Sequence, residues 1–385
     1  MLAGSLMTVL ISLTTAAAAC MDGDSETCHT KYGTRFGHDL LPSFMLAEGY
    51  FNLNHGSFGA TPRPVMEAQR RYQEQMEARP DQWFRDDYFM CVNEAREAIA
   101  KYVKAPSTDD IVLVENASGG VNAVLRSMVW KEGDVVLFLS SAYPMVKNTA
   151  AWLGESNPSV QVKEVQLGSD WPATGGQAVL KPLREALAEN KGKTKLVIVS
   201  HITSVPAVIL PVEDIVRMCR LSGVAGGDVQ VLVDGAHALG QVPIDLVGLG
   251  DPDYYISNGH KWLFSPKGSE PNVISSSGKK DFVGRFSYTG SRDYTAFCAI
   301  KEAFKFRHHV GDEKIYEYTA GLARWAAKML SRTWGTRVLV PLESQAFMIN
   351  VQLPTNSTTV AMQLQERLKI DYDTYIVQHS LLWLP

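Results

Sequence analysis

The sequence predicts an α/β fold, with a mostly parallel sheet in a large domain and a smaller C-terminal α+β domain. Two observations lead to this prediction. Short apolar runs rich in β-branched residues show almost no polar alternation, which is typical of strands buried on both faces of a parallel sheet. Amphipathic segments separate these runs, and this alternation of strands and helices indicates helical layers around a sheet.

The expected elements follow one another along the chain. Strands are predicted at Ile111–Val114, Val135–Leu139, Leu196–Val199, Val229–Val233 and Tyr254–Ile256. Helices are predicted at Pro64–Glu77, Asn93–Val103, Val121–Val129, Leu180–Ala188 and Val212–Cys219. After Asp312 come a long amphipathic helix at Ile315–Arg332, a strand at Phe347–Leu353 and a helix at Val360–Leu368. We therefore expect a leader over residues 1–30, an N-terminal arm and large domain over 31–310, and a small domain over 311–385 that is incomplete at its end.

Composition and charge exclude several classes of protein. The 385 residues are 45% hydrophobic and 20% charged, unlike a disordered chain. The net charge is −4 and no basic stripe is visible, so we expect no nucleic-acid partner. Five scattered cysteines without a CxxC spacing support neither a zinc site nor a disulfide framework. Adjacent His308 and His309 would point about 100° apart on a helix, so we interpret them as surface residues and expect no metal.

The first twenty residues differ from the rest of the chain. Met1–Cys20 carries no charged side chain and ends in the small residues Ala16–Ala19, which suit cleavage of a secretory signal. No lysine or arginine lies near Met1, although a signal normally has one there. Secretory and cytoplasmic locations therefore stay equally open. The segment is too short and too interrupted for a membrane span, and we expect none elsewhere.

Polar residues just after the strands are the candidates for chemistry, because ligands of open α/β sheets bind beyond the carboxyl ends of strands. These segments are Glu115–Gly120, Ser140–Tyr143, Ser200–Ser204, Asp234–His237 and Ser257–Lys261. The first leads small and hydroxyl residues into a helix, whose free N–H groups form a cradle for an anion. The last two bring a carboxylate and a lysine to strand ends.

A carboxylate, a lysine and a phosphate cradle together are what pyridoxal 5'-phosphate (PLP) requires. The lysine amine forms a Schiff base, and the carboxylate keeps the pyridine nitrogen protonated so that the ring accepts electrons. The sequence contains no GxGxxG, GxxxxGK[ST], HExxH or GxSxG motif, which removes the commonest competing sites.

Five segments carry a resemblance to a known family. They are Leu53–Ala60, Glu115–Ser118, Val233–Gly240, Gly259–Leu263 and Thr289–Asp293. In this order they resemble class V aminotransferases of PLP fold type I, the superfamily that includes cysteine desulfurases. Within it, the chain is most similar to the isopenicillin N epimerase-like branch, which also holds cysteine desulfhydrase-like enzymes and sulfoxide C–S lyases.

The resemblance implies a role for each matching residue. Lys261 would be the Schiff-base lysine and a proton carrier, Asp234 would pair with the ring nitrogen, and His237 would lie near the phenolic oxygen of the cofactor. The other implied cofactor contacts are Ala117, Ser118, Asn258 and His260 to the phosphate, Tyr143 stacked on the ring, Ser204 to its oxygen substituent, and Ser291 to the phosphate of a partner subunit. The last contact implies a homodimer with shared active sites.

The implied substrate is a small amino acid, with Asn54, His55 and Gly56 lining its entrance. The family commonly binds the substrate carboxylate with a C-terminal arginine, which has no recognisable counterpart here, so we consider Arg292. An incomplete chain and an impaired enzyme are the other interpretations. The segment Ser269–Asn272 also departs from the apolar strand that usually follows the lysine.

We expect C–S bond cleavage by β-elimination on a cysteine-derived substrate, in which Lys261 removes the Cα proton to give a quinonoid. Epimerisation and transamination are alternatives within the superfamily, and a pseudoenzyme scaffold is the alternative outside it. A desulfurase needs a mobile, exposed cysteine, whereas Cys298 has a helix-like context that indicates a buried thiol.

Overall fold

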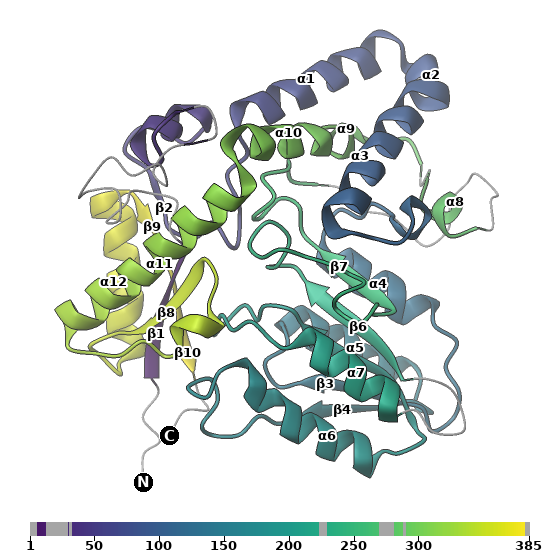
Figure 1. Cartoon of the computed structure of the whole chain (residues 1–385), viewed down its shortest axis with the longest axis vertical. Coiled ribbons are helices and arrows are strands. Elements are labelled where there is room, and N and C mark those ends of the chain that lie inside the picture. Colours follow the sequence, from purple (N-terminus) through teal and green to yellow (C-terminus); the bar gives the residue numbers. More distant parts are fainter. Residues whose placement is uncertain are drawn as a thin grey trace.

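A twisted parallel sheet and a smaller antiparallel sheet organise the chain, which is seen here as a computed structural model (Figure 1). The structure describes residues 6–12, 30, 33–222, 229–268, 281–287 and 290–381. The small residues Ala16–Ala19, the departure at Ser269–Asn272 and Thr289 of the last resemblance segment lie outside the described residues.

The larger sheet has five parallel strands in the order β4-β3-β5-β6-β7. Their bounds are β3 Val135–Leu139, β4 Gln161–Val165, β5 Thr194–Ser200, β6 Gln230–Gly235 and β7 Tyr254–Ser257. The three interior strands are largely buried on both faces, as their unbroken apolar runs require. All five strands run the same way, so their carboxyl ends meet at one edge of the sheet.

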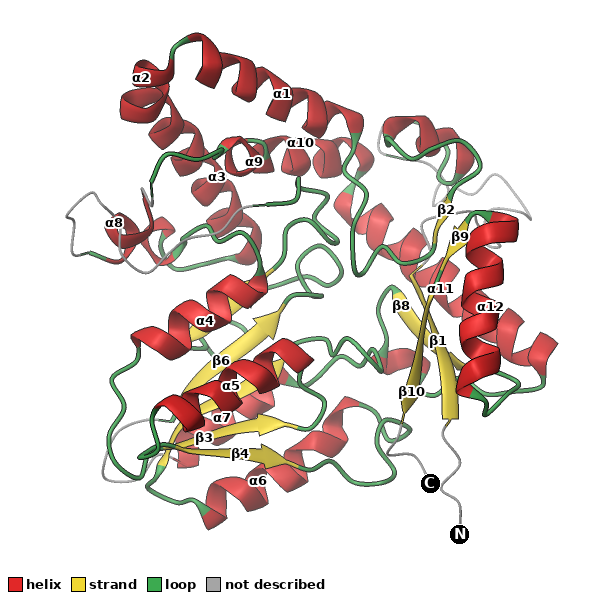
Figure 2. Cartoon of the chain, turned by 180° about the vertical axis from the view of Figure 1, so that it is seen from behind, coloured by secondary structure: helices red, strands yellow, loops and turns green. Residues whose placement is uncertain are grey.

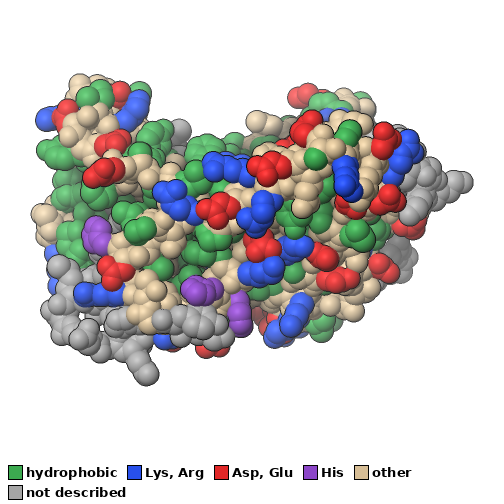
Figure 3. All heavy atoms as spheres, turned by 90° about the horizontal axis from the view of Figure 1, so that it is seen from above, with side chains coloured by type: hydrophobic (Ala, Val, Ile, Leu, Met, Phe, Trp, Pro, Cys, Tyr) green, Lys and Arg blue, Asp and Glu red, His purple; other side chains and the backbone are tan. Residues whose placement is uncertain are grey.

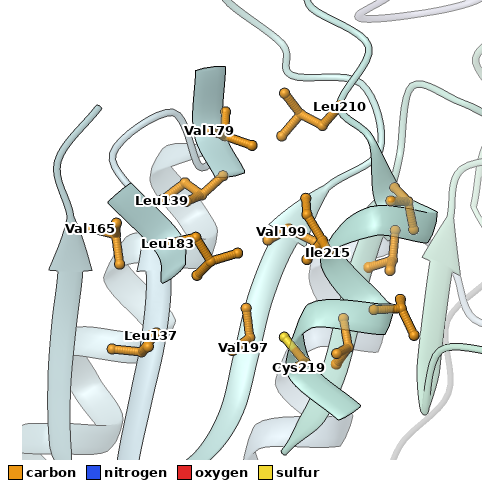
Figure 4. Packing of buried hydrophobic residues seen from close by; sticks show 14 of the residues in the cluster. Leu137, Leu139, Val165, Val179, Leu183, Val197, Val199, Leu210, Ile215 and Cys219 are labelled. Atoms are coloured by element: carbon orange, nitrogen blue, oxygen red, sulfur yellow. The ribbon is translucent and has the colours of Figure 1, made fainter. Parts of the chain in front are cut away.

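Helices cover both faces of this sheet (Figure 2). One face packs against α4 Ala117–Ser127 and α5 Pro144–Ser156. The other packs against α6 Leu180–Glu189 and α7 Val212–Ser222, where Leu137, Val197 and Ile215 interdigitate in the cluster shown in Figure 4. Because apolar side chains fill both faces, the polar residues of the strands gather at the strand ends.

A third group of helices lies beyond the β7 edge of the larger sheet (Figure 1). It consists of α1 Arg63–Ala78, α2 Pro80–Gln82, a π-helical turn η3 at Trp83–Asp87, α3 Tyr88–Val103, α8 Phe282–Ser287, α9 Thr295–Cys298 and α10 Ile300–Val310. A disulfide joins Cys91 of α3 to Cys298 of α9. The expectation of a buried Cys298 is confirmed, but the residue is paired, contrary to our inference from the odd cysteine count.

The smaller sheet has three antiparallel strands in the order β10-β1-β8, with bounds β1 Leu6–Ser12, β8 Met348–Gln352 and β10 Val377–Leu381. Helix α11 Asp312–Trp334 packs on β8, and α12 Thr358–Tyr372 contacts β10. A short parallel pair joins β2 Phe51–Asn52 to β9 Thr374–Tyr375. The apolar segment that we treated as part of a leader thus contributes the central strand of this sheet.

Single 3-10 turns complete the described chain: η2 His38–Ser43, η4 Thr108–Asp110, η5 Gly176–Val179 and η6 Leu342–Ser344.

The structure differs from the expected elements in several places, among them α8, α9, β2, β9 and β10, which were not predicted. The run Ile111–Val114 is extended but joins no strand within the described chain, because Arg96 of α3 binds the carbonyl oxygens of Ile111 and Thr108 at 2.8 and 2.7 Å. Edge strand β4 escaped prediction because its side chains are mostly polar and exposed. Helices α5 and α10 also escaped prediction.

Charged side chains of both signs are interspersed on the face drawn in Figure 3. His308 and His309 are exposed on α10, as expected, and the described residues contain no cluster of three metal-ligating side chains. Among the helices described, none is long and apolar enough to cross a bilayer.

Candidate active site

The ends of two neighbouring strands bring the predicted carboxylate and lysine to the same edge of the sheet. Asp234 is the penultimate residue of β6, and Lys261 lies in the loop four residues after β7 ends at Ser257. The β6–β7 ladder pairs Asp234 with Ile256 and Gly235 with Ser257, so the loop leaves the sheet beside the carboxylate. The order of strands therefore places both residues, as the sequence predicted.

Lys261 and His237 are in direct contact. The Lys261 Nζ atom lies 3.0 Å from Nε2 of His237. Burial lowers the pKa of Lys261 to about 8, although the negative charge of Asp234 acts in the opposite direction. Burial and the positive charge of Lys261 hold the pKa of His237 well below 6.5, so the imidazole is neutral at pH 7. The Lys261 amine can therefore lose and regain a proton near neutral pH.

Asp234 is a buried carboxylate with one main-chain donor. Its Oδ1 accepts a hydrogen bond from the Ala236 N–H at 3.0 Å. Burial raises the pKa of Asp234, and the Ala236 N–H and the Lys261 charge counter that effect. A buried carboxylate favours a cationic partner, which a protonated ring nitrogen would supply.

The N-terminus of α4 forms the predicted anion cradle. Asn116 caps the helix by accepting the Gly119 N–H, and Asn258 Oδ1 accepts the Ala117 N–H at 2.8 Å. Asn258 thus takes the N–H of Ala117 that we expected a phosphate to use. Ser118 follows Ala117 in this first turn, where N–H groups have no intrahelical acceptor. Its N–H and hydroxyl are the donors that stay available.

The main chain around Lys261 packs closely against the Leu53–Ala60 segment. His55 is fully buried, and its Nε2 donates to the Lys261 carbonyl oxygen at 2.9 Å, so it supports this loop; its place at a substrate entrance stays a prediction. A Cβ atom on Gly59 would lie 2.3 Å from the carbonyl oxygens of His260 and Lys261. Only glycine fits there, because any side chain would displace the loop that carries the lysine.

A buried arginine that sequence reasoning missed joins the two functional loops. Arg307 of α10 is 1% exposed; its Nη1 donates to the Trp262 carbonyl oxygen at 2.7 Å and its Nη2 to that of Gly240 at 3.2 Å. Its Nε pairs with Asp312 at 2.5 Å. The signal was its place on the apolar face of α10, beside Ala303 and Val310. Arg307 thus holds the loops after His237 and Lys261 together.

The other predicted contacts lie around these loops. Tyr143, the residue just before α5, has 48% of its surface exposed. Ser204 is half-buried in the turn after β5. His260 directly precedes the lysine, and burial lowers its pKa to about 4. Asn54 is buried and accepts the Ser57 hydroxyl at 2.9 Å. A Cβ atom on Gly56 would lie 2.9 Å from Met348 Sδ and 3.7 Å from His237 Nδ1, which brings β8 close to the site.

Arg292 is ion-paired with Glu115, the residue before the Asn116 cap. Its guanidinium also lies 4.7 Å from the ring centre of Tyr294, and its Nε atom is buried without a hydrogen-bond partner. Ser291, just before it, is exposed. The pair therefore ties the Gly290–Asp293 segment to the start of the cradle.

The lysine, carboxylate and cradle at the strand ends lie within or beside a region of the chain that matches a known protein family. The model of the family Aminotransferase class-V matches residues 52–269, more than half of the chain. The chain belongs to this family. It is 30% identical over 356 residues to "Putative L-cysteine desulfhydrase 1" of Oryza sativa subsp. japonica, covering 84% of this chain and 72% of that protein.

Two further similarities extend this result. "Hercynylcysteine sulfoxide lyase" of Schizosaccharomyces pombe (strain 972 / ATCC 24843) is 26% identical over 364 residues, covering 89% of each chain. The solved complex between the cystine C-S lyase C-DES and its reaction product cysteine persulfide has a TM-score of 0.71 at 20% identity, covering 86% of this chain and 92% of that chain. The expected PLP fold type I is confirmed.

The residues present fit PLP, the cofactor of this family. His237 Nδ1 is a buried polar atom with no hydrogen-bond partner, which a polar group of a bound molecule would satisfy. Asp234 supplies a buried negative charge, Lys261 an amine with a lowered pKa, and Ser118 two donors at a helix N-terminus. Together these groups match the ring nitrogen, aldehyde and phosphate of PLP.

We predict that Arg307→Met lowers the free energy of unfolding by about 3 kcal/mol, because two buried carbonyl groups and Asp312 lose their partner. Urea unfolding of the variant measures this loss. Arg367→Met is the matched control. Arg367, like Arg307, pairs with an aspartate, here Asp371 at 3.0 Å, but its side chain is 75% exposed. Its replacement should therefore lower the free energy of unfolding by less than about 1 kcal/mol. Equal losses in the two variants would contradict the role of Arg307.

The lowered pKa of Lys261 predicts a pH dependence of stability. Between pH 8 and its ordinary value of 10.5, the unfolded chain holds a proton that the folded chain lacks, so folding becomes more favourable as the pH rises. Relative to Lys261→Met, cofactor-free wild type should gain about 2 kcal/mol of unfolding free energy between pH 8 and pH 10. The exposed Lys305 provides the control Lys305→Met, which should follow wild type. If the unfolding free energies of wild type and Lys261→Met changed equally with pH, the lowered pKa of Lys261 would be excluded.

Proposed function

We propose that this chain is a PLP-dependent C–S lyase that breaks the Cβ–S bond of a cysteine-derived amino acid. The observation that carries the proposal is the buried Lys261 amine, which lies 3.0 Å from a neutral His237, in the loop that follows the strand next to that of Asp234. The extent of similarity to proteins named for cysteine desulfhydrase and sulfoxide lyase activity supports sulfur-containing substrates.

Bound PLP supplies an electron sink for the amino-acid carbon next to the nitrogen. Lys261 provides the base: with a pKa of about 8, its amine is partly unprotonated at neutral pH and can take the Cα proton. Neutral His237 holds the amine through Nε2 and can exchange a proton with it. Asp234 keeps a negative charge at the ring-nitrogen position. For cysteine, the balanced reaction with water gives sulfide, pyruvate and ammonia.

Other site residues do not contact Lys261, and we assign their roles from their places in the fold. Ser118 and His260 bind the phosphate, with Asn258 ordering the cradle through the Ala117 N–H. Tyr143 stacks on the ring from the end of β3, and Ser204 approaches its oxygen substituent from the end of β5. Asn54 and Gly56 line the approach to His237, and Arg292 binds the substrate carboxylate while Glu115 orients it.

We predict that purified protein loaded with PLP is yellow, bleaches with borohydride, and carries the reduced cofactor on Lys261 in peptide maps. With L-cysteine it should release sulfide, pyruvate and ammonia in equal amounts. Lys261→Ala should lose covalent cofactor and at least about 10³-fold in rate, since it removes the proton carrier. Lys305→Ala, which removes an exposed lysine, should behave as wild type.

Three outcomes would contradict the proposal. A protein that stays colourless with added PLP would be a scaffold and not an enzyme. Exchange of the Cα proton without sulfide release would favour epimerisation. Amino transfer to a keto acid would favour transamination.

We further propose a homodimer with shared active sites. Phe58, within the segment that packs on Lys261, is 69% exposed, and Met90 on α3 is 61% exposed. Large apolar side chains beside an active site are typical of surfaces that a second subunit covers. Ser291 is exposed as well and would reach the phosphate of the partner subunit.

Light scattering should therefore give twice the chain mass of 42.5 kDa. Phe58→Glu should shift the mass toward the monomer, because it places a charge in the contact. A wild-type protein that is monomeric at micromolar concentration would contradict the shared site.

A further inference from the structure

Two titratable side chains next to Asp234, the buried His201 and the half-buried Tyr255, have no part in the proposed reaction. His201 is the first residue after β5, and Tyr255 lies within β7. The His201 Nδ1 atom is 2.7 Å from the Tyr255 hydroxyl, and the two rings meet edge to face at 5.9 Å between centres. These residues come from the strands on either side of β6, so their hydrogen bond spans the strand that carries Asp234.

Gly235 makes this bridge possible. A Cβ atom on Gly235 would lie 2.5 to 2.6 Å from the ring and hydroxyl of Tyr255, so the phenol crosses β6 where β6 has no side chain. Successive side chains of a strand point to opposite faces, and Asp234 directly precedes Gly235. The bridge and the Asp234 carboxylate are therefore on opposite faces of the end of β6.

The bridge is also coupled to the main chain of Asp234. The His201 N–H donates to the Asp234 carbonyl oxygen at 2.9 Å, and Ser200 pairs with Asp234 in the ladder. Burial lowers the pKa of His201 to about 4, and burial together with the charge of Asp234 raises that of Tyr255 well above 10. Both side chains are neutral at pH 7, and either neutral tautomer of His201 makes the bond: Nδ1 accepts from the phenol, or Nδ1–H donates to the phenol oxygen. The bond persists over the whole working pH range.

We propose that His201 and Tyr255 are positioning residues for Asp234: their bridge fixes the end of β6 from behind, so that the carboxylate keeps its orientation toward the ring nitrogen of PLP. The inference rests on the PLP site of the proposed function but not on the identity of the substrate. Buried hydrogen-bonded pairs restrict a site to one geometry, and a displacement of about 1 Å can lower a rate by two orders of magnitude.

The experiment compares Tyr255→Phe with Tyr254→Phe. The first removes the bridging hydroxyl and keeps the ring that fills the space over Gly235, while the second removes a hydroxyl from the preceding residue, whose side chain packs in the cluster on the opposite face of the sheet. His201→Gln is a second variant that breaks the same bond. Each protein is loaded with PLP, and its absorption spectrum is recorded from pH 5 to pH 10.

The readout is the pH midpoint of the cofactor absorption band, which reports the charges around the cofactor: Asp234, Lys261, His237 and His260 face it, with His201 and Tyr255 behind. Tyr255→Phe and His201→Gln should shift this midpoint by about 0.5 unit or more, a threefold change in the protonation equilibrium. They should also slow the exchange of the Cα proton of a bound amino acid by about tenfold. The KM for that amino acid and the urea midpoint should stay close to those of Tyr254→Phe.

Three results would overturn the inference: the same midpoint and exchange rate in Tyr255→Phe, His201→Gln and Tyr254→Phe; a loss of stability in the first two without a spectral shift; or a changed KM with an unchanged exchange rate. Absence of sulfide release by wild type would contradict the C–S lyase proposal alone, because the spectrum and proton exchange can still be measured. A wild type that binds no PLP would overturn both.

Discussion

The guanidinium of Arg307 holds the two loops of the candidate site in register. One loop follows the strand with Asp234 and contains His237, and the other contains Lys261; no strand pairing joins them beyond the end of β7. Arg307 bonds to a carbonyl group in each, at Gly240 and Trp262, and Asp312 balances its charge. The 3.0 Å contact between His237 and Lys261 depends on this link, because its two atoms belong to different loops.

Glycines complete this arrangement where chains come too close for a side chain. Gly59 lets the segment after β2 pack on the Lys261 main chain, and His55 of that segment bonds to the Lys261 carbonyl. Gly240 has a positive φ of 85° and lies against Trp262, which brings its carbonyl group within reach of Arg307. Buried side chains and close main-chain contacts together position the lysine.

Sequence reasoning located Asp234 and Lys261 because both obey a rule of topology: parallel strands present their carboxyl ends at one edge. It also placed Ala117 and Ser118 at the N-terminus of a helix, because a cap and the first helical turn are local in sequence. It missed the supporting bond of His55 to the Lys261 carbonyl, and it missed Arg307 and Tyr255, which bond to residues 45 and 54 positions away. A hydrogen bond over such a separation leaves no periodic signal. Strand β4 and helix α5 were missed because an exposed polar strand and a helix of weak amphipathicity lack a distinct pattern.

The disulfide between Cys91 and Cys298 makes the packing around Arg292 depend on the redox state of the compartment. Cys298 ends the short helix that follows Arg292, while Cys91 belongs to α3, so the bond anchors the segment that reaches Glu115. Disulfides persist in oxidising compartments and are reduced by the glutathione and thioredoxin systems of the cytosol. In a reducing compartment, that segment would be held without the covalent link, by packing of α9 on α1 and α3 and by bonds such as the Arg292–Glu115 pair. Loss of the disulfide would then leave Arg292 and its ion pair with Glu115 less firmly anchored.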